Sequence, residues 1–116
     1  MRKQFLANTK YVWYSPHKLR LLADVIRGKG AVDALNWLTV YGTRRSLPLK
    51  KTLVSALANA RDLKSLEPVD LFVKEVRIDQ GPVKKYFKPG AMGRAMPQRK
   101  KQCHIKIIVE SRQKEV

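Results

Sequence analysis

The sequence predicts an α+β fold with three helices, three strands and a long basic hairpin. Three segments between residues 15 and 64 repeat apolar side chains at the three- or four-residue spacing of a helix. Residues 3–14, 69–78 and 103–109 instead show the alternation that is typical of strands. Between the last two strands, the stretch from Gly81 to Gln102 has no acidic residue and carries these basic ones: Lys84, Lys85, Lys88, Arg94, Arg99, Lys100 and Lys101.

Length and charge limit the class of protein. With 116 residues we expect one domain over residues 1–116, from which residues 79–104 protrude as a basic arm. The formal charge of +16, from 25 Lys and Arg against 9 Asp and Glu, predicts an anionic partner, and nucleic acid is the first candidate. No apolar run approaches the roughly 20 residues that span a bilayer, and the first residues lack the apolar stretch of a secretory signal. The protein is therefore expected to stay where it is made.

Residues 3–14 form the first predicted strand, with one half-buried face. Phe5, Ala7, Tyr11 and Trp13 share one parity, whereas Lys10 and Tyr14 fall on the other. At Ser15 the pattern changes, because Ser15 is a good N-cap and Pro16 suits the first position of a helix.

The first helix has one apolar and one charged face. Its apolar face carries Leu19, Leu22, Ala23 and Ile26, and we expect Gly28 to end the helix in the left-handed conformation. The opposite face carries His17, Arg20, Asp24 and Arg27, with Lys29 in the turn beyond. Such a face is either simply solvated or binds a partner, and this helix alone does not decide between the two.

Two further helices follow. The second is predicted after Gly30, with Ala31, Ala34, Leu35 and Leu38 as its apolar stripe, Trp37 at the rim and Tyr41–Gly42 at its end. The third has the longest stripe: Leu49, Leu53, Ala56, Leu57, Ala60 and Leu63. We expect it to start at Ser46, because a start at Thr43 would place Pro48 inside the helix and kink it. Arg44, Arg45, Lys50 and Lys51 form a second basic patch here, and Asn59 is expected to be a helix-surface amide.

Two strands flank the basic stretch. In residues 69–78 the apolar parity shifts between Leu71/Val73 and Val76/Ile78, which predicts either a β-bulge or a strong twist. In residues 103–109, Ile105, Ile107 and Val109 alternate against His104, Lys106 and Ile108. The lone Cys103 is expected to be a small buried or half-buried thiol, and residues 110–116 are expected to fray.

The segment between these strands is far longer than an ordinary hairpin loop of about two to five residues, so it is either an extended ribbon or a disordered loop. It has too little apolar surface for a core and too much like charge to fold on itself, so a polyanion is expected to order it. Tyr86 and Phe87 interleave with lysines, which favours RNA because aromatic rings stack on bases. Pro89, Gly90 and Gly93 allow a tight reversal at the tip.

The motifs of common enzymes are absent from the sequence. No GxxxxGK[ST], GxSxG or HExxH occurs, and the acidic residues are scattered singly. His17 and His104 lie in different predicted elements, and Cys103 stands directly beside His104, which is not a usual zinc-ligand spacing. We therefore expect no enzymatic activity, no metal and no cofactor.

Several motifs follow one another from about Ser15 to Val109. The first half contains Ser15-Pro16-His17-Lys18-Leu19-Arg20-Leu21-Leu22-Ala23-Asp24-Val25-Ile26-Arg27-Gly28-Lys29, Ala34-Leu35 and Ser55-Ala56-Leu57-Ala58-Asn59-Ala60. The second half contains Asp79-Gln80-Gly81-Pro82, Lys85, Pro89, Ala91, Gly93-Arg94-Ala95, Lys100-Lys101 and His104-Ile105. In this unbroken order the chain resembles the universal ribosomal large-subunit protein family numbered twenty-two, of bacterial or organellar type.

The resemblance implies three helices packed on a three-stranded antiparallel sheet with a long extended β-hairpin. It also implies a structural constituent of the large ribosomal subunit, in the cytoplasm or in an organelle. Such a protein binds large-subunit rRNA and neighbouring large-subunit proteins and aids assembly. Its hairpin lines the exit tunnel beside the nascent peptide, with the tip near the constriction shared with the protein numbered four and near the macrolide site. No membrane contact and no self-association are expected.

The candidate site residues follow from the basic surfaces together with the resemblance. We expect rRNA contacts from His17, Lys18, Arg20, Arg27, Lys29, Arg44, Arg45, Lys50, Lys84, Lys85, Tyr86, Arg94, Arg99, Lys100 and Lys101. The tunnel-facing tip is expected to comprise Lys88, Pro89, Gly90, Ala91, Met92 and Gly93.

The chain departs from the family pattern in the arm. Bacterial members commonly carry an Arg after the tip proline and often a Lys two residues later, where this chain has Gly90 and Met92. Pro97 replaces part of a polar and basic run on the returning limb, and we expect it to break the local pairing because proline lacks an N–H donor.

Two other functions remain open at this point. One is a free-standing basic RNA-binding or RNA-chaperone module outside the ribosome, which would not sediment with large subunits. The other is a membrane-active cationic protein, which would make vesicles leak in a way that RNA does not suppress.

Overall fold

The computed structural model describes residues 4–42, 44–89, 93 and 95–111. The elements follow in the order β1 (Gln4–Val12), α1 (Pro16–Ile26), α2 (Ala31–Tyr41), α3 (Ser46–Lys64), the short 3₁₀ helix η1 (Pro68–Asp70), β2 (Leu71–Pro89) and β3 (Ala95–Ser111). The strands form one antiparallel sheet in the order β1-β3-β2, so β3 lies in the centre. The predicted α+β fold is confirmed.

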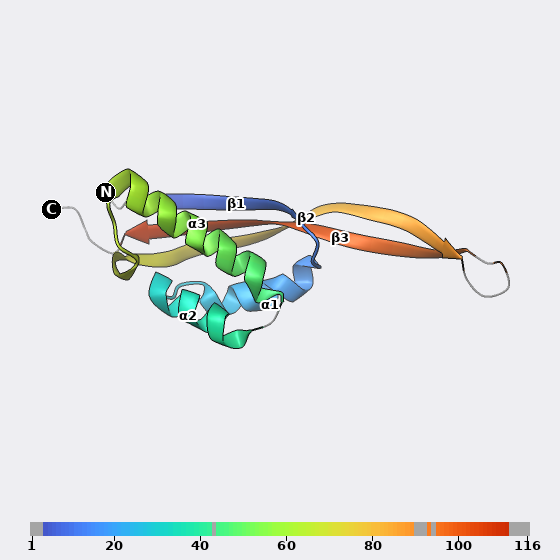
Figure 1. The fold of residues 1–116 in the computed structure, drawn as a ribbon, viewed down its shortest axis with the longest axis horizontal. Coiled ribbons are helices and arrows are strands. Elements are labelled where there is room, and N and C mark those ends of the chain that lie inside the picture. The colour runs from blue at the N-terminus through green and yellow to red at the C-terminus, as the bar shows by residue number, and fades with distance from the viewer. Residues whose placement is uncertain (1–3, 43, 90–92, 94, 112–116) are drawn as a thin grey trace.

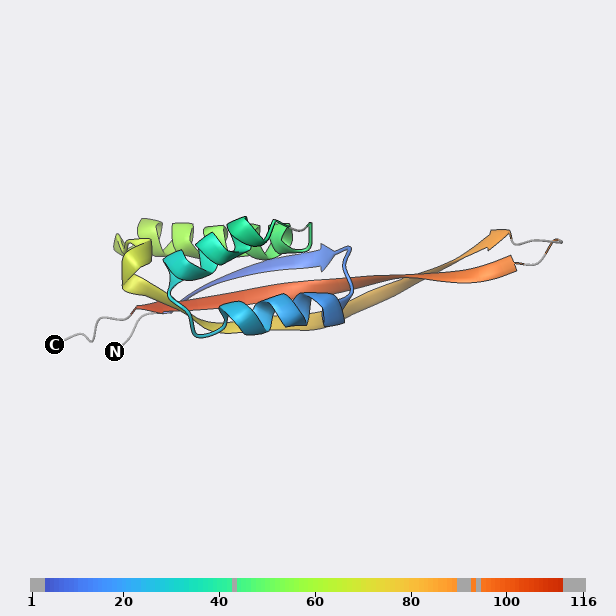
Figure 2. The ribbon, with the colours of Figure 1, turned by 90° about the horizontal axis from the view of Figure 1, so that it is seen from below.

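The helices cover one part of the sheet and leave the arm bare. Helix α3 packs over the sheet beside β1, α1 runs along the free edge of β2, and α2 lies against α3 (Figure 1, Figure 2). Beyond the helices, β2 and β3 continue alone as a two-stranded ribbon (Figure 1). The molecule is therefore a compact head with a long arm.

The core lies between the helices and the inner face of the sheet. The predicted apolar face of α1 is buried, and so is that of α2 except for Leu35, which is half-buried. Cys103, Ile105, Ile107 and Val109 of the central strand are buried too. Helix α3 begins at Ser46, as predicted, so Pro48 falls in its first turn. Leu63 was predicted to belong to the α3 stripe, but it is 70% exposed because the last turn of α3 extends past the core.

The edge strands β1 and β2 each carry extra residues, whereas β3 is regular. The register of β2 on β3 shifts between Val73 and Glu75, which confirms the predicted bulge. A second shift in β2 lies between Gln80 and Val83. In β1 the register shifts between Thr9 and Val12, so two residues of β1 oppose the single residue His104.

The bulge in β1 overturns part of the predicted strand pattern. Phe5 and Ala7 are buried as expected, but Tyr11 is 60% and Trp13 is 53% exposed. The extra residue exchanges the two faces of the strand, so that Val12 and Tyr14 pack against the core instead.

Three predictions about where the strands begin, end or lose their pairing differ from the structure. Strand β2 begins at Leu71, because Val69 belongs to η1. Glu110 and Ser111 were expected to fray, but they continue β3 and are buried; residues 112–116 lie outside the described residues. Pro97 does not break the ribbon, because Phe87 faces it in an unbroken register that runs from Val83 and Lys101 to Pro89 and Ala95.

Helix α1 ends by joining the edge of β2. Gly28 has φ +83°, the predicted left-handed conformation, but its N–H donates to the Val73 carbonyl at 2.9 Å and not to the helix. The Val73 N–H in turn donates to the Lys29 carbonyl at 2.8 Å. The turn after α1 therefore satisfies backbone groups that an edge strand would otherwise leave unpaired.

Candidate nucleic-acid interface

The register of the arm places basic residues opposite one another. Lys84 pairs with Lys100, and Lys85 pairs with Arg99. Residues that pair directly across two antiparallel strands are close neighbours, so the register twice opposes like charges. Such pairs destabilise a free ribbon, and anionic phosphates next to them would remove the repulsion.

The root of the arm is a tight backbone contact. A Cβ atom added to Gly81 would lie 3.1 Å from the carbonyl oxygen and 3.2 Å from the carbonyl carbon of Gln102. Gly81 thus allows the two limbs to approach closely, and Pro82, which has no N–H, occupies the bulge where a ladder hydrogen bond is lost. Seven consecutive pairs then extend from Val83 to Pro89, or about 23 Å at 3.3 Å per residue.

Two of the predicted RNA-binding arginines also hold the head together. Arg20 donates from Nε and Nη2 to the Ile78 carbonyl oxygen, at 3.3 and 3.0 Å. Arg27 donates from Nη2 to the Val76 carbonyl at 2.7 Å and from Nη1 to Asp24 Oδ1 at 2.6 Å. The two arginines therefore cover the free edge of β2, a structural role that the sequence did not reveal. Their contacts with rRNA remain a prediction.

The other predicted basic residues of α1, and Lys29 in the turn beyond it, lie outside the core. His17 and Lys18 are exposed, and Lys29 places Nζ 5.9 Å from the centre of the Trp37 ring. That ring stacks on Tyr41 at 4.9 Å, which confirms Trp37 as a rim contact. These side chains can approach phosphates without disturbing the core.

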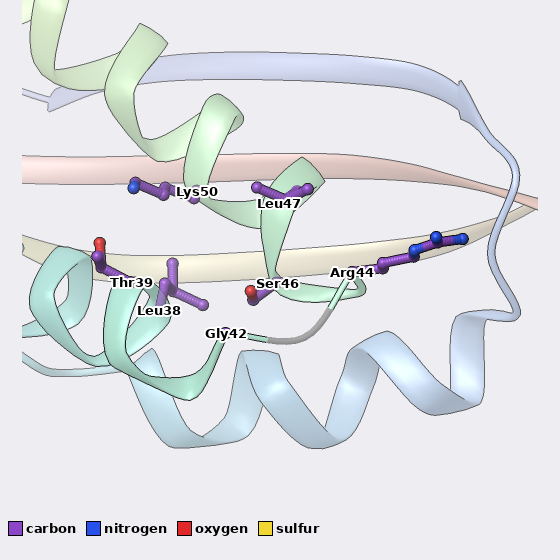
Figure 3. A pocket seen from close by; sticks show the side chains of 7 residues that line it. All are labelled: Leu38, Thr39, Gly42, Arg44, Ser46, Leu47 and Lys50. Atoms are coloured by element: carbon purple, nitrogen blue, oxygen red, sulfur yellow. The ribbon is translucent and has the colours of Figure 1, made fainter.

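The second basic patch surrounds the start of α3. Arg44 and Lys50 line a cavity of about 150 Å³ that also involves Leu38, Thr39, Gly42, Ser46 and Leu47 (Figure 3). The two basic side chains point in opposite directions, Arg44 towards the β1–α1 connection and Lys50 away from it (Figure 3). They therefore do not converge on one anion and suit separate points along a polyanion.

Asn59 also has a role beyond the surface amide that was expected. It is exposed, but its Nδ2 donates to the Leu6 carbonyl of β1 at 3.0 Å. Nearby, Thr9 Oγ1 and Thr52 Oγ1 lie 2.7 Å apart. Polar bridges thus fasten α3 to β1, as the two arginines fasten α1 to β2.

The single thiol is chemically protected. Cys103 is completely buried, as predicted, and it is a free thiol. Burial raises the pKa of the Cys103 thiol, and the positive charge of Arg20 opposes part of that rise. Over the described part of the chain, no three His, Cys, Asp or Glu residues gather as a metal site, and no helix is both long and apolar enough to cross a membrane.

Part of the predicted site lies outside the described residues, namely Gly90, Ala91, Met92 and Arg94. Lys88 pairs with Met96, and Pro89 pairs with Ala95, so the ribbon continues up to the predicted reversal. Gly93 has φ +76°, a conformation that favours glycine and fits a turn.

The fold and the arm define a class of proteins, namely small and strongly basic domains that project an acid-free ribbon beyond their own core. The chain belongs to the ribosomal protein L22p/L17e family, whose model matches residues 7–110.

Three curated relatives illustrate the similarity. The large ribosomal subunit protein uL22 of Synechococcus sp. (strain JA-2-3B'a(2-13)) is 45% identical over 103 residues, which cover 89% of this chain and 83% of that protein. The protein of the same name from Syntrophobacter fumaroxidans is 45% identical over 103 residues, with coverages of 89% and 94%. The large ribosomal subunit protein uL22c of Chlorokybus atmophyticus is 42% identical over 104 residues, with coverages of 90% and 87%.

Proposed function

We propose that this chain is a structural constituent of the large ribosomal subunit, that its head and arm bind large-subunit rRNA during assembly, and that the tip of the arm lines the nascent-peptide exit tunnel. The observation that carries the proposal is the ribbon itself. It has no acidic residue between Gly81 and Gln102, and it opposes like charges across its two strands. A ribbon of this kind is stable where a polyanion surrounds it.

The head contributes a second set of contacts. His17 and Lys18 of α1, and Arg44 and Arg45 before α3, are exposed at the starts of two helices that begin at the same end of the head (Figure 1). Contacts of lysine and arginine with phosphates position a protein on RNA without reading the base sequence. The protein is thus anchored to rRNA at its head and along the limbs of its arm.

The tip differs from the limbs in chemistry. Between Lys88 and Arg94 the chain has no charged residue, whereas both limbs are rich in lysine. A short uncharged segment suits a surface past which a peptide slides, because it offers few strong attachment points for side chains of either charge.

Sedimentation tests the ribosomal assignment. Lysate from cells that contain the native protein is layered on a sucrose gradient, and the protein is expected to sediment with large subunits. High salt is expected to release it from them. A protein that stays at the top while large subunits pellet would contradict the assignment and favour a free RNA-binding module.

Cross-linking tests the position of the tip. In a Cys103→Ala background, Ala91→Cys is joined by a short bis-maleimide to a stalled nascent peptide that contains one cysteine. We expect adducts from Ala91→Cys and none from Val40→Cys, since Val40 is 85% exposed on the head. Equal adducts from both positions, or none from the tip, would remove the tunnel from the proposal.

A further inference from the structure

Tyr11 has an unusual backbone conformation for an aromatic residue. It lies in the β1 bulge with φ +60°, and Ser65 is the only other non-glycine residue with positive φ in the described ranges. This conformation is rare for side chains with a Cβ, because that atom crowds the following carbonyl. Backbone strain of this kind often accompanies a functional role, so Tyr11 is a candidate for one.

His104 holds Tyr11 in place. Its N–H donates to His104 Nδ1 at 3.0 Å, and the two rings meet edge to face with 4.9 Å between centroids and 87° between planes. His104 sits directly opposite the bulge on the central strand. Since Tyr11 is nevertheless 60% exposed, its ring is oriented by the protein but still open to solvent.

The packing of the head does not need the Tyr11 ring. Val12 and Tyr14, its neighbours in the chain, are the ones that pack against the core. The bulge therefore turns outwards a large aromatic side chain that the regular alternation of β1 would have turned inwards. An exposed, pre-oriented ring is suited to bind a flat ligand.

The charges around Tyr11 identify that ligand. Lys10 is exposed beside it, and Lys106 lies two residues from His104, on the same face of β3. Tyr14 Oη donates to the Arg44 carbonyl at 3.3 Å, which ties the loop before α3 to this end of the head. On the other side of His104, its partner in β2 is the acidic Asp79, which would repel phosphates. Phosphates are therefore expected on the β1 side of His104.

The position of Tyr11 relates it to the arm. Strand β1 ends where β2 and β3 leave the head, and the basic α2–α3 loop lies at the same end (Figure 1, Figure 3). An RNA strand that follows the basic limbs towards the head would reach Tyr11 at the root of the arm.

We propose that Tyr11, held by His104, is a stacking site for an unpaired RNA base at the root of the arm. This inference rests on the proposed function, since it assumes that the protein binds RNA. Stacking on an aromatic ring needs a base that is outside a double helix, and it accepts any base because every base has a flat face. The site therefore distinguishes single-stranded from duplex RNA. Lysines and arginines alone distinguish the two poorly, because both kinds of RNA carry phosphates.

The test compares two RNA probes with the full chain. One probe is a single-stranded uridylate 12-mer, and the other is a 12-base-pair RNA duplex. Tyr11→Gly removes the ring and also relieves the left-handed strain, so the variant is expected to keep a cooperative unfolding transition. We expect its affinity for the single strand to fall by about 5- to 150-fold, on the scale of one lost base–aromatic stack, while its affinity for the duplex stays the same.

Two further variants complete the test. Tyr11→Phe should keep the preference for single strands because the ring is retained. Leu63→Ala removes an exposed apolar side chain, 70% accessible in the last turn of α3 at the end of the head opposite the arm, and should leave both affinities unchanged (Figure 1). An equal fall for both probes with Tyr11→Gly, or no fall, would overturn the stacking site and leave the proposed function intact. If the native chain binds neither probe nor large-subunit rRNA, the proposed function itself fails.

Discussion

Arg20 donates two hydrogen bonds to one oxygen, the Ile78 carbonyl, at the last buried position of β2 before the arm. Replacing Arg20 with alanine would leave that edge carbonyl to water and remove hydrogen bonds from a charged donor, which typically contribute about 1.5–3 kcal/mol. Because the side chain is partly exposed, we expect Arg20→Ala to lower the free energy of unfolding by about 1.5 kcal/mol, measured by urea titration.

Arg61→Ala is the matched control for Arg20. Arg61 pairs with Glu67 at 3.3 Å, and the two side chains are 63% and 61% exposed. Exposed pairs contribute about 0–1 kcal/mol, so this variant should change stability little. If both substitutions cost the same, the bonds to Ile78 are not important for the fold.

The Cys103 thiol predicts a dependence of stability on alkaline pH. Burial raises the pKa of Cys103 above its ordinary value of 9.0, so the native state holds the proton more tightly than the unfolded state does. This stabilisation is fully present below pH 9 and is lost as the pH rises through the raised native pKa, by up to about 1.4 kcal/mol per pH unit. The stability difference between native protein and Cys103→Ala, measured by urea titration from pH 7 to 10.5, should therefore shrink only above pH 9. A constant difference would contradict this.

At the scale of residues, burial could be predicted from the sequence, but partners could not. Apolar spacing identified Leu19, Ile26 and Leu53 as core residues because the period of a helix decides which side chains share a face. The bonds of Arg20, Arg27 and Asn59 to backbone carbonyls join residues 58, 49 and 53 positions apart. Every backbone carbonyl looks the same in a sequence, so only the packed fold shows which one an arginine reaches.

At the scale of elements, the root of the arm depends on the absence of a side chain at Gly81. The Cβ of an alanine there would meet backbone atoms of Gln102 at 3.1 and 3.2 Å. The neighbouring Cys103 is paired with both β1 and β2, so β3 cannot easily move away. We expect Gly81→Ala to cost at least about 1 kcal/mol of stability, the lower end for overpacking. Hydrogen exchange should quicken at the amides of residues 101–103, while the amides of α3 stay protected. Unchanged exchange at the root would show that β3 accommodates the methyl group.

The three bulges show what an apolar pattern can and cannot reveal. The bulge after Val73 was predictable because it moves Val76 and Ile78 to a new parity. The bulge in β1 was not predictable, because the aromatic Tyr11 and Trp13 have the same parity in the sequence as the buried Phe5 and Ala7. The bulge at Gly81–Pro82 falls among polar residues, where there is no apolar alternation to shift.

At the scale of the whole molecule, shape and charge agree. The radius of gyration is 17.6 Å, whereas a compact chain of this length would have about 13 Å, and the longest dimension is 71 Å against 25 and 20 Å. The acid-free composition predicted that the arm would leave the core, because it has too little apolar surface to be buried. The length of the paired ribbon could not be predicted, because the sequence indicated that Pro97 would break the pairing, whereas the register continues past it.

The charge of the limbs can be separated from the fold by one variant in which Lys84, Lys85, Lys100 and Lys101 are replaced by glutamine. The register opposes Lys84 to Lys100 and Lys85 to Arg99, so the substitutions remove repulsion from the free protein, about 0.2–1 kcal/mol for each pair. We therefore expect the isolated variant to unfold cooperatively and at least as stably as the native chain at low salt. A loss of cooperative unfolding would show that the arm belongs to the core.

The same variant should bind large-subunit rRNA more weakly and with a shallower dependence on salt. If the native chain neutralises roughly 6–10 phosphates, its affinity should fall by about 10³- to 10⁵-fold between 50 and 200 mM salt, on the scale established for duplex DNA. Each lost phosphate contact should reduce the slope of log affinity against log salt by about 0.7–0.9, so four lost contacts should reduce it by about 3. Filter binding at four salt concentrations measures both slopes. Equal slopes for native and variant chains would mean that the limbs touch no phosphate, because counterion release depends on the number of contacts and not on the strength of any one.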